Sequence, residues 1–360
     1  MKKSLTADQV SLIVERSSNG SPPTLTEIAA LLRLTSKAAT EALFEGARKL
    51  REIYFGNRVF LYGFIYLSTY CRNNCAFCHW RTELTTLSRY RKTADEIYGA
   101  AIELAAAGVS LIDLTMGEDP QLLTPDGFEL LCQTAAKIGQ QTQLPIMLSP
   151  GVLSQTQLSM ARRAGVTWYA LYQETHNRNL FKAWRRGQDF EKRMKSKKKA
   201  AAMGFLVEEG VLLGAGATPE DLADSIVAMG KLGATQLRAM AYVPSPGGLP
   251  PDYRVKASNQ ELLMIAVLRL SYPRALIPAS LDVEGLQGLA PRLSAGANVV
   301  TSLVPAYLGL AGVAHQALDI ENHNRGVEKV SEILTSNDLS VGQPQEYQEL
   351  LRQMKRNNHL

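Results

Sequence analysis

Between residues 59 and 336, short apolar runs alternate with longer amphipathic segments. The short runs are rich in β-branched and aromatic residues, which is typical of strands, and the longer segments have the apolar spacing of helices. Strands are predicted at residues 59–67, 109–115, 145–149, 167–172, 207–213, 235–242, 274–279 and 297–302. Helices are predicted near residues 94–107, 125–139, 153–164, 188–203, 218–231, 258–270, 283–293 and 325–336. Eight strand–helix units predict a complete (β/α)8 TIM barrel, with its active site at the carboxyl ends of the strands.

The segment before the barrel is predicted to be helical. Its residues 25–43 resemble a DNA-binding helix-turn-helix, but the would-be recognition helix at residues 36–43 holds one lysine and several alanines. Such a helix has little with which to contact phosphates or base edges, so a packed helical cap is the favoured interpretation. The chain is accordingly divided into an N-terminal helical lead-in, a barrel and a polar C-terminal tail at residues 1–55, 56–340 and 341–360.

The composition is that of an ordinary globular protein. Of 360 residues, 46% are apolar and 20% are charged, with a formal net charge of +5. No apolar run is long enough to span a bilayer and no targeting segment is visible, so we expect a cytoplasmic protein with no membrane partner and no nucleic-acid partner. Much of the positive charge lies in Lys195, Lys197, Lys198 and Lys199, which are expected on a solvated helix face.

Three of the four cysteines lie within eight residues, in the spacing C-x3-C-x2-C. Cys71, Cys75 and Cys78 directly follow the first predicted strand, which places them at the mouth of the barrel. Three thiolates can hold a four-iron cluster and leave one iron open for a substrate or cofactor. A structural zinc bound by these cysteines and His79 is the competing interpretation, although such sites usually have paired C-x2-C knuckles. Cys132 lies in an apolar helical pattern and is expected to be a small buried side chain.

The cysteine spacing resembles the signature of the radical S-adenosylmethionine (radical SAM) enzymes, in which the three cysteines hold a [4Fe–4S] cluster. The aromatic Phe77 just before the last cysteine also fits. Two further groups of residues suit S-adenosylmethionine. Gly117 and Glu118 follow the second strand, where a glycine lets backbone groups approach a ligand. Glu174 follows the fourth strand and Arg193 lies in the next helix, which together offer an acceptor and a cation.

Other strand ends carry charges that a packed barrel would not select. Asp113 and Arg238 lie within predicted strands, and Ser280 and Asp282 follow a third. Buried charges cost several kcal/mol unless they are paired, so pairing of Arg238 with Asp113 or Asp282 is the simplest explanation. The same set, one cation and two anions, would also complement a ligand that has one carboxylate and two ammonium groups, such as lysine.

Several stretches together resemble one branch of the radical SAM superfamily. They are residues 114–120, 171–175, 189–193, 214–216 and 276–282, with 294–298 as a further match. The resemblance covers roughly residues 55–335 and is closer to the 3-methylornithine synthases than to biotin synthase and the hydrogenase maturase HydE. It implies isomerisation of L-lysine to 3-methylornithine, the first step of pyrrolysine biosynthesis. In that reaction a 5′-deoxyadenosyl radical takes a hydrogen from the lysine side chain, and the carbon skeleton then fragments and rejoins.

The resemblance also implies a role for each matching residue. The cluster would be held by Cys71, Cys75 and Cys78. S-adenosylmethionine would be bound by Phe77, Gly117, Glu118, Ser149, Glu174 and Arg193. The amino acid would be bound by Asp113, Arg238, Ser280 and Asp282, in agreement with the charge count above. A reductant such as flavodoxin or ferredoxin is the implied protein partner.

The chain departs from the family pattern at two positions. His79 stands where relatives often have a tyrosine, and Ala217 stands where biotin synthase relatives have an acidic residue, so no role is assigned to Ala217. Two other functions stay open at this point. One is a biotin-synthase-like radical enzyme that acts on a different amino acid. The other is a DNA-binding protein whose cluster senses redox state.

Overall fold

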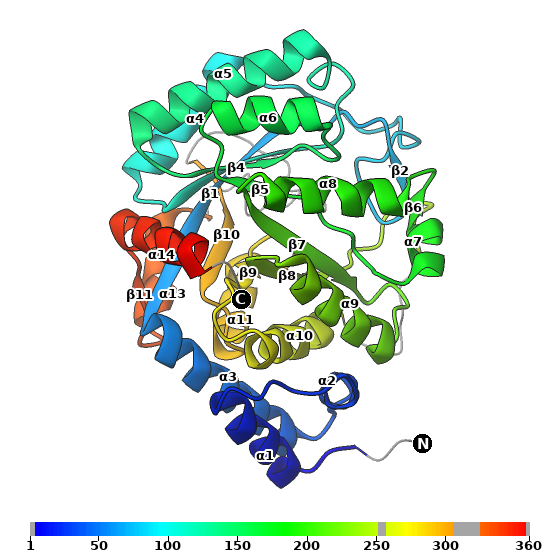
Figure 1. Cartoon of the computed structure of the whole chain (residues 1–360), viewed down its shortest axis with the longest axis vertical. Helices are drawn as coiled ribbons and strands as arrows, with labels where there is room; N and C mark the ends of the chain where they lie inside the picture. Colours follow the sequence, from blue (N-terminus) through cyan, green and yellow to red (C-terminus); the bar gives the residue numbers. More distant parts are fainter. Residues whose placement is uncertain (1–3, 251–256, 306–324, 358–360) are drawn as a thin grey trace.

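The centre of the molecule is a barrel of eight parallel strands (Figure 1). The computed structural model describes residues 4–250, 257–305 and 325–357. The strands are β1 (Arg58–Ser68), β3 (Leu111–Met116), β4 (Ile146–Ser149), β5 (Trp168–Ala170), β7 (Leu206–Leu213), β8 (Gln236–Ala241), β9 (Pro278–Ser280) and β10 (Val299–Leu303). They follow the order β8-β7-β5-β4-β3-β1-β10-β9, and a parallel bridge between Gln236 and Leu276 joins the two ends. The predicted (β/α)8 barrel is confirmed, although β5 is shorter than predicted and β9 begins later.

Helices surround the barrel at the predicted places (Figure 1). They are α4 (Ala94–Ala106), α5 (Pro125–Thr142), α6 (Gln155–Arg163), α8 (Phe190–Ala202), α9 (Pro219–Leu232), α10 (Ala257–Ser271), α11 (Leu289–Ser294) and α13 (Val327–Thr335). Capping side chains fix several of the first turns. The Thr93 hydroxyl accepts from the Glu96 N–H while the Glu96 carboxylate accepts from the Thr93 N–H, as the sequence predicts. The helix predicted at 283–293 instead opens as a short 3-10 helix, η1 (Gly285–Gly288), before α11.

The barrel interior changes from apolar to charged along the strands. Parallel register places Phe64, Asp113 and Met147 side by side on β1, β3 and β4. Towards the amino ends of the strands the interior is an apolar cluster that includes Leu111, Met147, Trp168, Leu206, Leu276 and Val299. Asp113, Arg238 and Ser280 are buried farther along their strands. The charged side chains therefore gather at the carboxyl end, where barrel enzymes have their sites.

The N-terminal helices pack on the outside of the barrel, at the lower end of Figure 1. α1 (Ala7–Ser18) packs against α3 (Lys37–Phe55), which in turn contacts α10, and α2 (Leu25–Leu31) contacts α9. Leu43, Ala47 and Leu50 of α3 are buried. The would-be recognition helix is thus the first part of a longer helix that supports the barrel.

A C-terminal helix, α14 (Pro344–Asn357), covers the amino ends of the strands next to the short strand β11 (Ser340–Val341), which pairs with β1. Tyr347 and Leu351 of α14 belong to the apolar cluster inside the barrel. The Tyr347 hydroxyl lies 2.5 Å from the Tyr62 hydroxyl, which also donates to Gln236 Oε1 at 2.8 Å. The expectation of a polar tail at residues 341–360 did not include this packing, because it rested on the overall polarity of the segment and not on the helical spacing of Tyr347, Leu350, Leu351 and Met354.

No helix in the described part of the chain is long and apolar enough to cross a membrane. The expected cytoplasmic location stays a prediction.

The packing of Tyr347 predicts different effects for two substitutions. Tyr347→Ala empties a fully buried site and should lower the free energy of unfolding by about 3–5 kcal/mol. Tyr347→Phe removes only the hydroxyl and should cost about 1 kcal/mol, because the Tyr62 hydroxyl keeps Gln236 as a partner. Chemical denaturation of both variants measures the difference. Equal stability of Tyr347→Ala and the parent would show that α14 does not close the barrel.

Candidate active site

The cysteine loop follows the carboxyl end of β1, as predicted. A short antiparallel pair anchors it: β2 (Asn74–Cys75) pairs with β6 (Arg185–Arg186), and Cys75 stands opposite Arg185. Cys75 is buried, and Cys71 and Cys78 are partly buried. The loop is therefore held against the segment between α7 (Arg178–Trp184) and α8.

Each of the three sulfurs accepts a hydrogen bond. Cys71 Sγ accepts from the Asn73 N–H at 3.4 Å, and Cys78 Sγ accepts from the Trp80 N–H at 3.3 Å. Burial and the proximity of Cys75 and Cys71 raise the pKa of the Cys78 thiol to about 12. Thiols that oppose one another's ionisation become thiolates together when a positive centre binds them. These side chains therefore fit the iron–sulfur cluster that the sequence predicts.

The zinc alternative needs three cysteines and His79 around one ion. Among residues 4–250, 257–305 and 325–357, no group of three or more His, Cys, Asp or Glu side chains is placed to hold a single metal ion. A cubane cluster has no such requirement, because each thiolate binds a different iron. Cys132 of α5 is buried as predicted, and burial raises the pKa of its thiol to about 11.

Gly117, after β3, lies directly against the cysteine loop. A Cβ atom at this position would come within 2.7 Å of the Tyr70 carbonyl oxygen and 2.8 Å of Cys71 Cβ. Both atoms belong to a packed segment, so only glycine fits without moving the loop. The structure thus gives Gly117 a packing role beside a cluster cysteine, while its role in cofactor binding stays a prediction.

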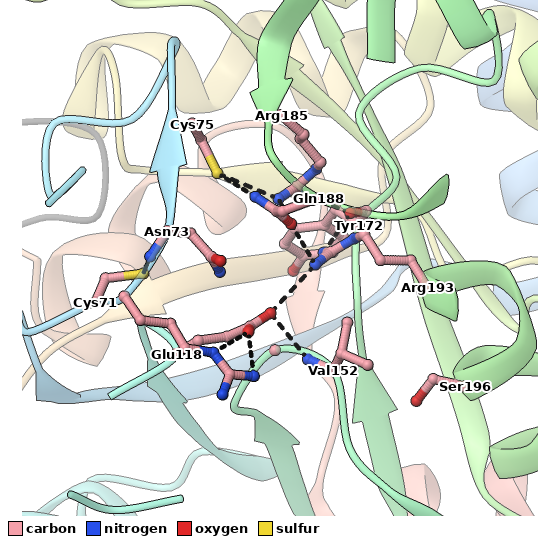
Figure 2. A network of polar contacts seen from close by, with 12 residues as sticks. Cys71, Asn73, Cys75, Glu118, Val152, Tyr172, Arg185, Gln188, Arg193 and Ser196 are labelled. Carbon is pink, nitrogen blue, oxygen red and sulfur yellow. Dashed lines mark hydrogen bonds and ion pairs between the residues drawn. The ribbon is translucent and has the colours of Figure 1, made fainter. Parts of the chain in front are cut away.

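Glu118 is buried at the centre of a network of donors (Figure 2). Arg72 donates to Glu118 Oε2 from Nε at 3.0 Å and from Nη2 at 2.9 Å, and the Val152 N–H donates to Oε1 at 3.1 Å. Arg193 Nη1 lies 3.5 Å from Oε1. Burial alone would raise the pKa of Glu118, but Val152, Arg193 and Arg72 together hold it below its ordinary value. The carboxylate is therefore ionised and fixed at the end of β3.

Glu174 is buried after β5 in a backbone conformation with φ of 69°. Its N–H and carbonyl bond to Gly210 and Leu212 of β7, which holds this uncommon conformation in place. Arg185 Nη2 donates to Glu174 Oε1 at 2.8 Å, whereas the buried Oε2 has no hydrogen-bond partner. Burial raises the pKa of Glu174 although Arg185 opposes the shift. A buried acceptor without a partner is suited to a ligand hydroxyl or ammonium group.

Arg193 lies on α8 but is only 4% exposed. It donates to the Tyr172 carbonyl at 2.8 Å and to Gln188 Oε1 at 3.2 Å, in addition to its ion pair with Glu118. Burial and the nearby Arg185 lower the pKa of Arg193 to about 10, which still leaves the guanidinium charged. Figure 2 shows Arg193 directed towards Glu118 and Gln188. The predicted cofactor residues Glu118 and Arg193 are thus in direct contact.

A cavity of about 160 Å³ lies beside this network. All four predicted substrate residues line it, together with Phe77 and Cys78 of the cysteine loop and with Glu174. The other lining residues are mostly apolar or aromatic and include Phe64, Tyr172, Leu212, Met240, Tyr242 and Val243. The cavity is smaller than the ligand sites usual in proteins, so it suits only a small ligand. Ser149 is not among its lining residues; it pairs in register with Thr115 at the end of β4.

The expected pairing of Arg238 with Asp113 or Asp282 is wrong. Arg238 Nε donates at 2.7 Å to Oε1 of Glu208, which lies on the adjacent strand β7, and the Tyr172 hydroxyl donates to Glu208 Oε2 at 2.9 Å. Burial disfavours the charge of Arg238, but Glu208 raises its pKa above the ordinary value. Glu208 was not predicted, although it lies two residues from Leu206 and thus on the inner face of β7.

Asp113 and Asp282, two of the carboxylates that line the cavity, differ in their surroundings. Burial, and next the charge of Glu208, raise the pKa of Asp113 to about 7, and the Thr115 hydroxyl donates to Asp113 Oδ1 at 2.7 Å. Asp282 accepts from the Ser280 hydroxyl at 3.0 Å and lies 3.6 Å from Arg325 Nη1. Asp113 is therefore poised to change charge near neutral pH, and its ionisation favours a cationic ligand.

Two of the contacts with the cluster cysteines come from residues that the sequence did not single out. Gln188 Nε2 donates to Cys75 Sγ at 2.9 Å, and Arg185 Nη1 lies 3.6 Å from the same sulfur. The guanidinium of Arg185 also lies 5.1 Å from the ring centre of Phe77. The available signal was a pair of arginines, Arg185 and Arg186, in the segment before α8, which by itself indicates no site.

The expectation of a solvated lysine face on α8 is wrong for Lys197. Its side chain is fully buried, donates to Gln173 Oε1 at 2.9 Å and forms an ion pair with Glu209 of β7. Burial lowers the pKa of Lys197 to about 8, although Glu209 opposes the shift. The pair joins α8 to the strand that carries Glu208.

Comparison with known proteins shows the family of this chain. Residues 65–228 match the model of the radical SAM superfamily. The 3-methylornithine synthase of Methanosarcina acetivorans is 40% identical over 327 residues, which cover 91% of this chain and 92% of that protein. The [FeFe] hydrogenase maturase subunit HydE of Thermotoga maritima is 28% identical over 75% of this chain and 77% of its own length.

Among solved structures, a crystal structure of methylornithine synthase (PylB) aligns with a TM-score of 0.88 and 36% identity. The alignment covers 94% of this chain and 99% of that one. The similarity therefore extends over the barrel and the cysteine loop. The chain belongs to the 3-methylornithine synthase family of the radical SAM superfamily.

Proposed function

We propose that the protein isomerises L-lysine to 3-methylornithine, the first step of pyrrolysine biosynthesis, with a [4Fe–4S] cluster and S-adenosylmethionine. One observation carries the proposal. A single small cavity is lined by Cys78 of the cysteine loop and by the charged set Asp113, Arg238 and Asp282. A diamino acid bound by that set would lie in a cavity that one of the proposed cluster cysteines lines. The family relationship gives the reaction, and the cavity supports the substrate.

Three of the residues proposed for the cofactor, Glu118, Arg193 and Glu174, are connected through Gln188 and Arg185. When bound to Cys71, Cys75 and Cys78, the cluster together with S-adenosylmethionine supplies the 5′-deoxyadenosyl radical that starts the rearrangement. We assign the cofactor carboxylate to Arg193, because a guanidinium binds a carboxylate through two parallel hydrogen bonds. Glu174 suits a donor of the cofactor, because its buried Oε2 lacks a partner. We also propose that Gly117, Ser149 and Phe77 lie next to bound S-adenosylmethionine.

The substrate residues divide by charge. We assign the lysine carboxylate to Arg238, which Glu208 holds on the inner face of β8. Asp113 and Asp282 receive the two ammonium groups, and we place the side-chain ammonium at Asp113. The apolar walls surround the carbon chain and exclude water, so each charge of the ligand must find its partner in the protein.

The reduction that starts the reaction requires an electron donor. We propose a small electron-transfer protein, flavodoxin or ferredoxin, because these proteins supply single electrons at low potential. Titration of the reconstituted enzyme with each reduced protein would identify the donor by its rate of electron transfer.

The proposed function is tested by anaerobic incubation of the reconstituted protein with S-adenosylmethionine, a chemical reductant and lysine. Mass analysis should find 3-methylornithine, which has the mass of lysine but a different retention time. Cleavage of S-adenosylmethionine without any lysine isomer would contradict the proposal and favour a radical enzyme that acts on another amino acid. The fourth cysteine provides the control: Cys132→Ala should keep product formation, while Cys75→Ala should abolish it.

The raised pKa of Asp113 predicts a pH-dependent affinity for lysine. At pH 6 the carboxyl of Asp113 in the ligand-free protein is mostly protonated, since its pKa of about 7 lies above that pH. Binding of an ammonium group favours the ionised form, so lysine affinity should rise between pH 6 and pH 7.5, with release of a proton at the lower pH. The charged groups that act on Asp113 are Glu208 of β7, Arg238 of β8 and Asp282.

Calorimetry in two buffers with different ionisation enthalpies measures this proton release. Asp113→Asn should bind lysine more weakly, by about 3–5 kcal/mol, and should release no proton. Norleucine, which lacks the side-chain ammonium, should bind the parent poorly. Its affinity should fall less than that of lysine in Asp113→Asn. Unchanged proton release in Asp113→Asn would show that Asp113 does not bind the ammonium group.

The buried position of Arg193 predicts a selective loss of cofactor affinity. Arg193→Ala should weaken equilibrium binding of S-adenosylmethionine while lysine binding changes little, because Arg193 pairs with Glu118 and is not itself a lining residue of the substrate cavity. Lys192→Ala is the matched control, since Lys192 is the exposed neighbour on the same helix. Equal cofactor affinity in the two variants would disprove the assignment.

A further inference from the structure

We infer that Gln188 and Arg185 set the reduction potential of the cluster through the sulfur of Cys75, and that they connect this sulfur to the residues that bind S-adenosylmethionine. The inference rests on the proposed function, since it concerns the same cluster. It assigns positioning roles to two residues for which the sequence indicated none.

Gln188 uses both ends of its amide. Nε2 donates to Cys75 Sγ at 2.9 Å, while Oε1 accepts from Arg193 Nη1 at 3.2 Å and from Arg185 Nη1 at 3.5 Å (Figure 2). The carbonyl of the amide is held by two cations, which directs the N–H group towards the sulfur. A single side chain therefore links a cluster cysteine to Arg193.

Arg185 makes the second link. It is buried, its Nη1 lies 3.6 Å from Cys75 Sγ, and its Nη2 donates to Glu174 Oε1 at 2.8 Å. The pairing of β2 with β6 places Cys75 opposite Arg185 and fixes the two backbones. Arg185 thus brings a positive charge to the sulfur and contacts the second proposed cofactor residue.

The three cysteines differ in the donors that reach them. Cys71 and Cys78 accept from backbone N–H groups of Asn73 and Trp80, which belong to the same loop. Cys75 accepts from side chains that lie more than a hundred residues away in the sequence. Donor side chains, unlike backbone N–H groups, can be substituted and can move when a ligand binds. Cys75 is therefore the cysteine through which the protein can adjust the reduction potential of the cluster.

Donors to the sulfur favour the reduced form. One-electron reduction adds one negative charge to the cluster and its thiolates, and the electron comes from the external reductant. Hydrogen bonds and a nearby cation stabilise this added charge, so they raise the reduction potential. Arg193 and Glu174, which are proposed to bind the cofactor, contact Gln188 and Arg185 respectively. Cofactor occupancy and cluster reduction are therefore coupled, and each changes the other by the same factor.

The test is a redox titration of the reconstituted protein, followed by electron paramagnetic resonance, with and without S-adenosylmethionine and without lysine. Gln188→Leu removes the donor and should lower the midpoint potential. It should also reduce the difference between the cofactor-bound and cofactor-free potentials. Gln188→Glu replaces the donor with a carboxylate and should lower the potential further. Arg186→Gln is the control, because Arg186 carries a charge on the same short strand but its side chain is exposed.

The titration separates this inference from the proposed function, since it needs neither lysine nor product. Iron and sulfide analysis confirms that each variant holds a full cluster. Gln188→Asn keeps an amide on a shorter side chain. Its midpoint potential provides a second measurement if the leucine variant binds less iron. Parent-like potentials in fully loaded Gln188 variants would overturn the inference, even if the enzyme makes 3-methylornithine. A parent-like potential in Arg186→Gln together with a lower one in Gln188→Leu would support it.

Discussion

The arrangement of the active site depends on the pairing of charges that are buried at the carboxyl end of the barrel. A buried charge without a partner costs several kcal/mol, so each must lie where a partner can reach it. Glu208 holds Arg238 across adjacent strands, and Glu118 is held by arginines from the cysteine loop and from α8. These ion pairs neutralise part of the charge in the site. They also fix the positions of the remaining hydrogen-bonding groups that a ligand could contact.

The same constraint joins the cysteine loop to the barrel. Arg185 binds Glu174 on one side and approaches Cys75 on the other, while Gln188 connects Cys75 to Arg193. The loop therefore does not carry its metal site alone. The residues proposed for the cofactor also support Cys75, the buried cysteine of the loop, which makes cluster assembly and cofactor binding parts of one network.

The sequence predicted the barrel because strands and helices alternate with clear periodicity, and it predicted the candidate residues because their chemistry is unusual at strand ends. Cys71, Cys75 and Cys78 needed only their spacing, and Asp113 stood out within an apolar run. The partner of a buried charge is harder to predict, because it depends on strand register and on which face a residue occupies. For this reason Arg238 was paired with the wrong carboxylates, and buried Lys197 was placed on a solvated face within a run of lysines. The role of α14 was missed although Tyr347, Leu350, Leu351 and Met354 have the spacing of one helix face, because the segment is polar in overall composition.

The central claim is that lysine bound in the cavity lined by Cys78 would give a hydrogen atom to the 5′-deoxyadenosyl radical. Incubation with fully deuterated lysine, followed by mass analysis of the 5′-deoxyadenosine that is formed, tests it directly. If lysine occupies the cavity lined by Asp113, Arg238 and Asp282, the 5′-deoxyadenosine should carry deuterium from the substrate. Formation of 5′-deoxyadenosine without deuterium, at saturating labelled lysine, would contradict the claim.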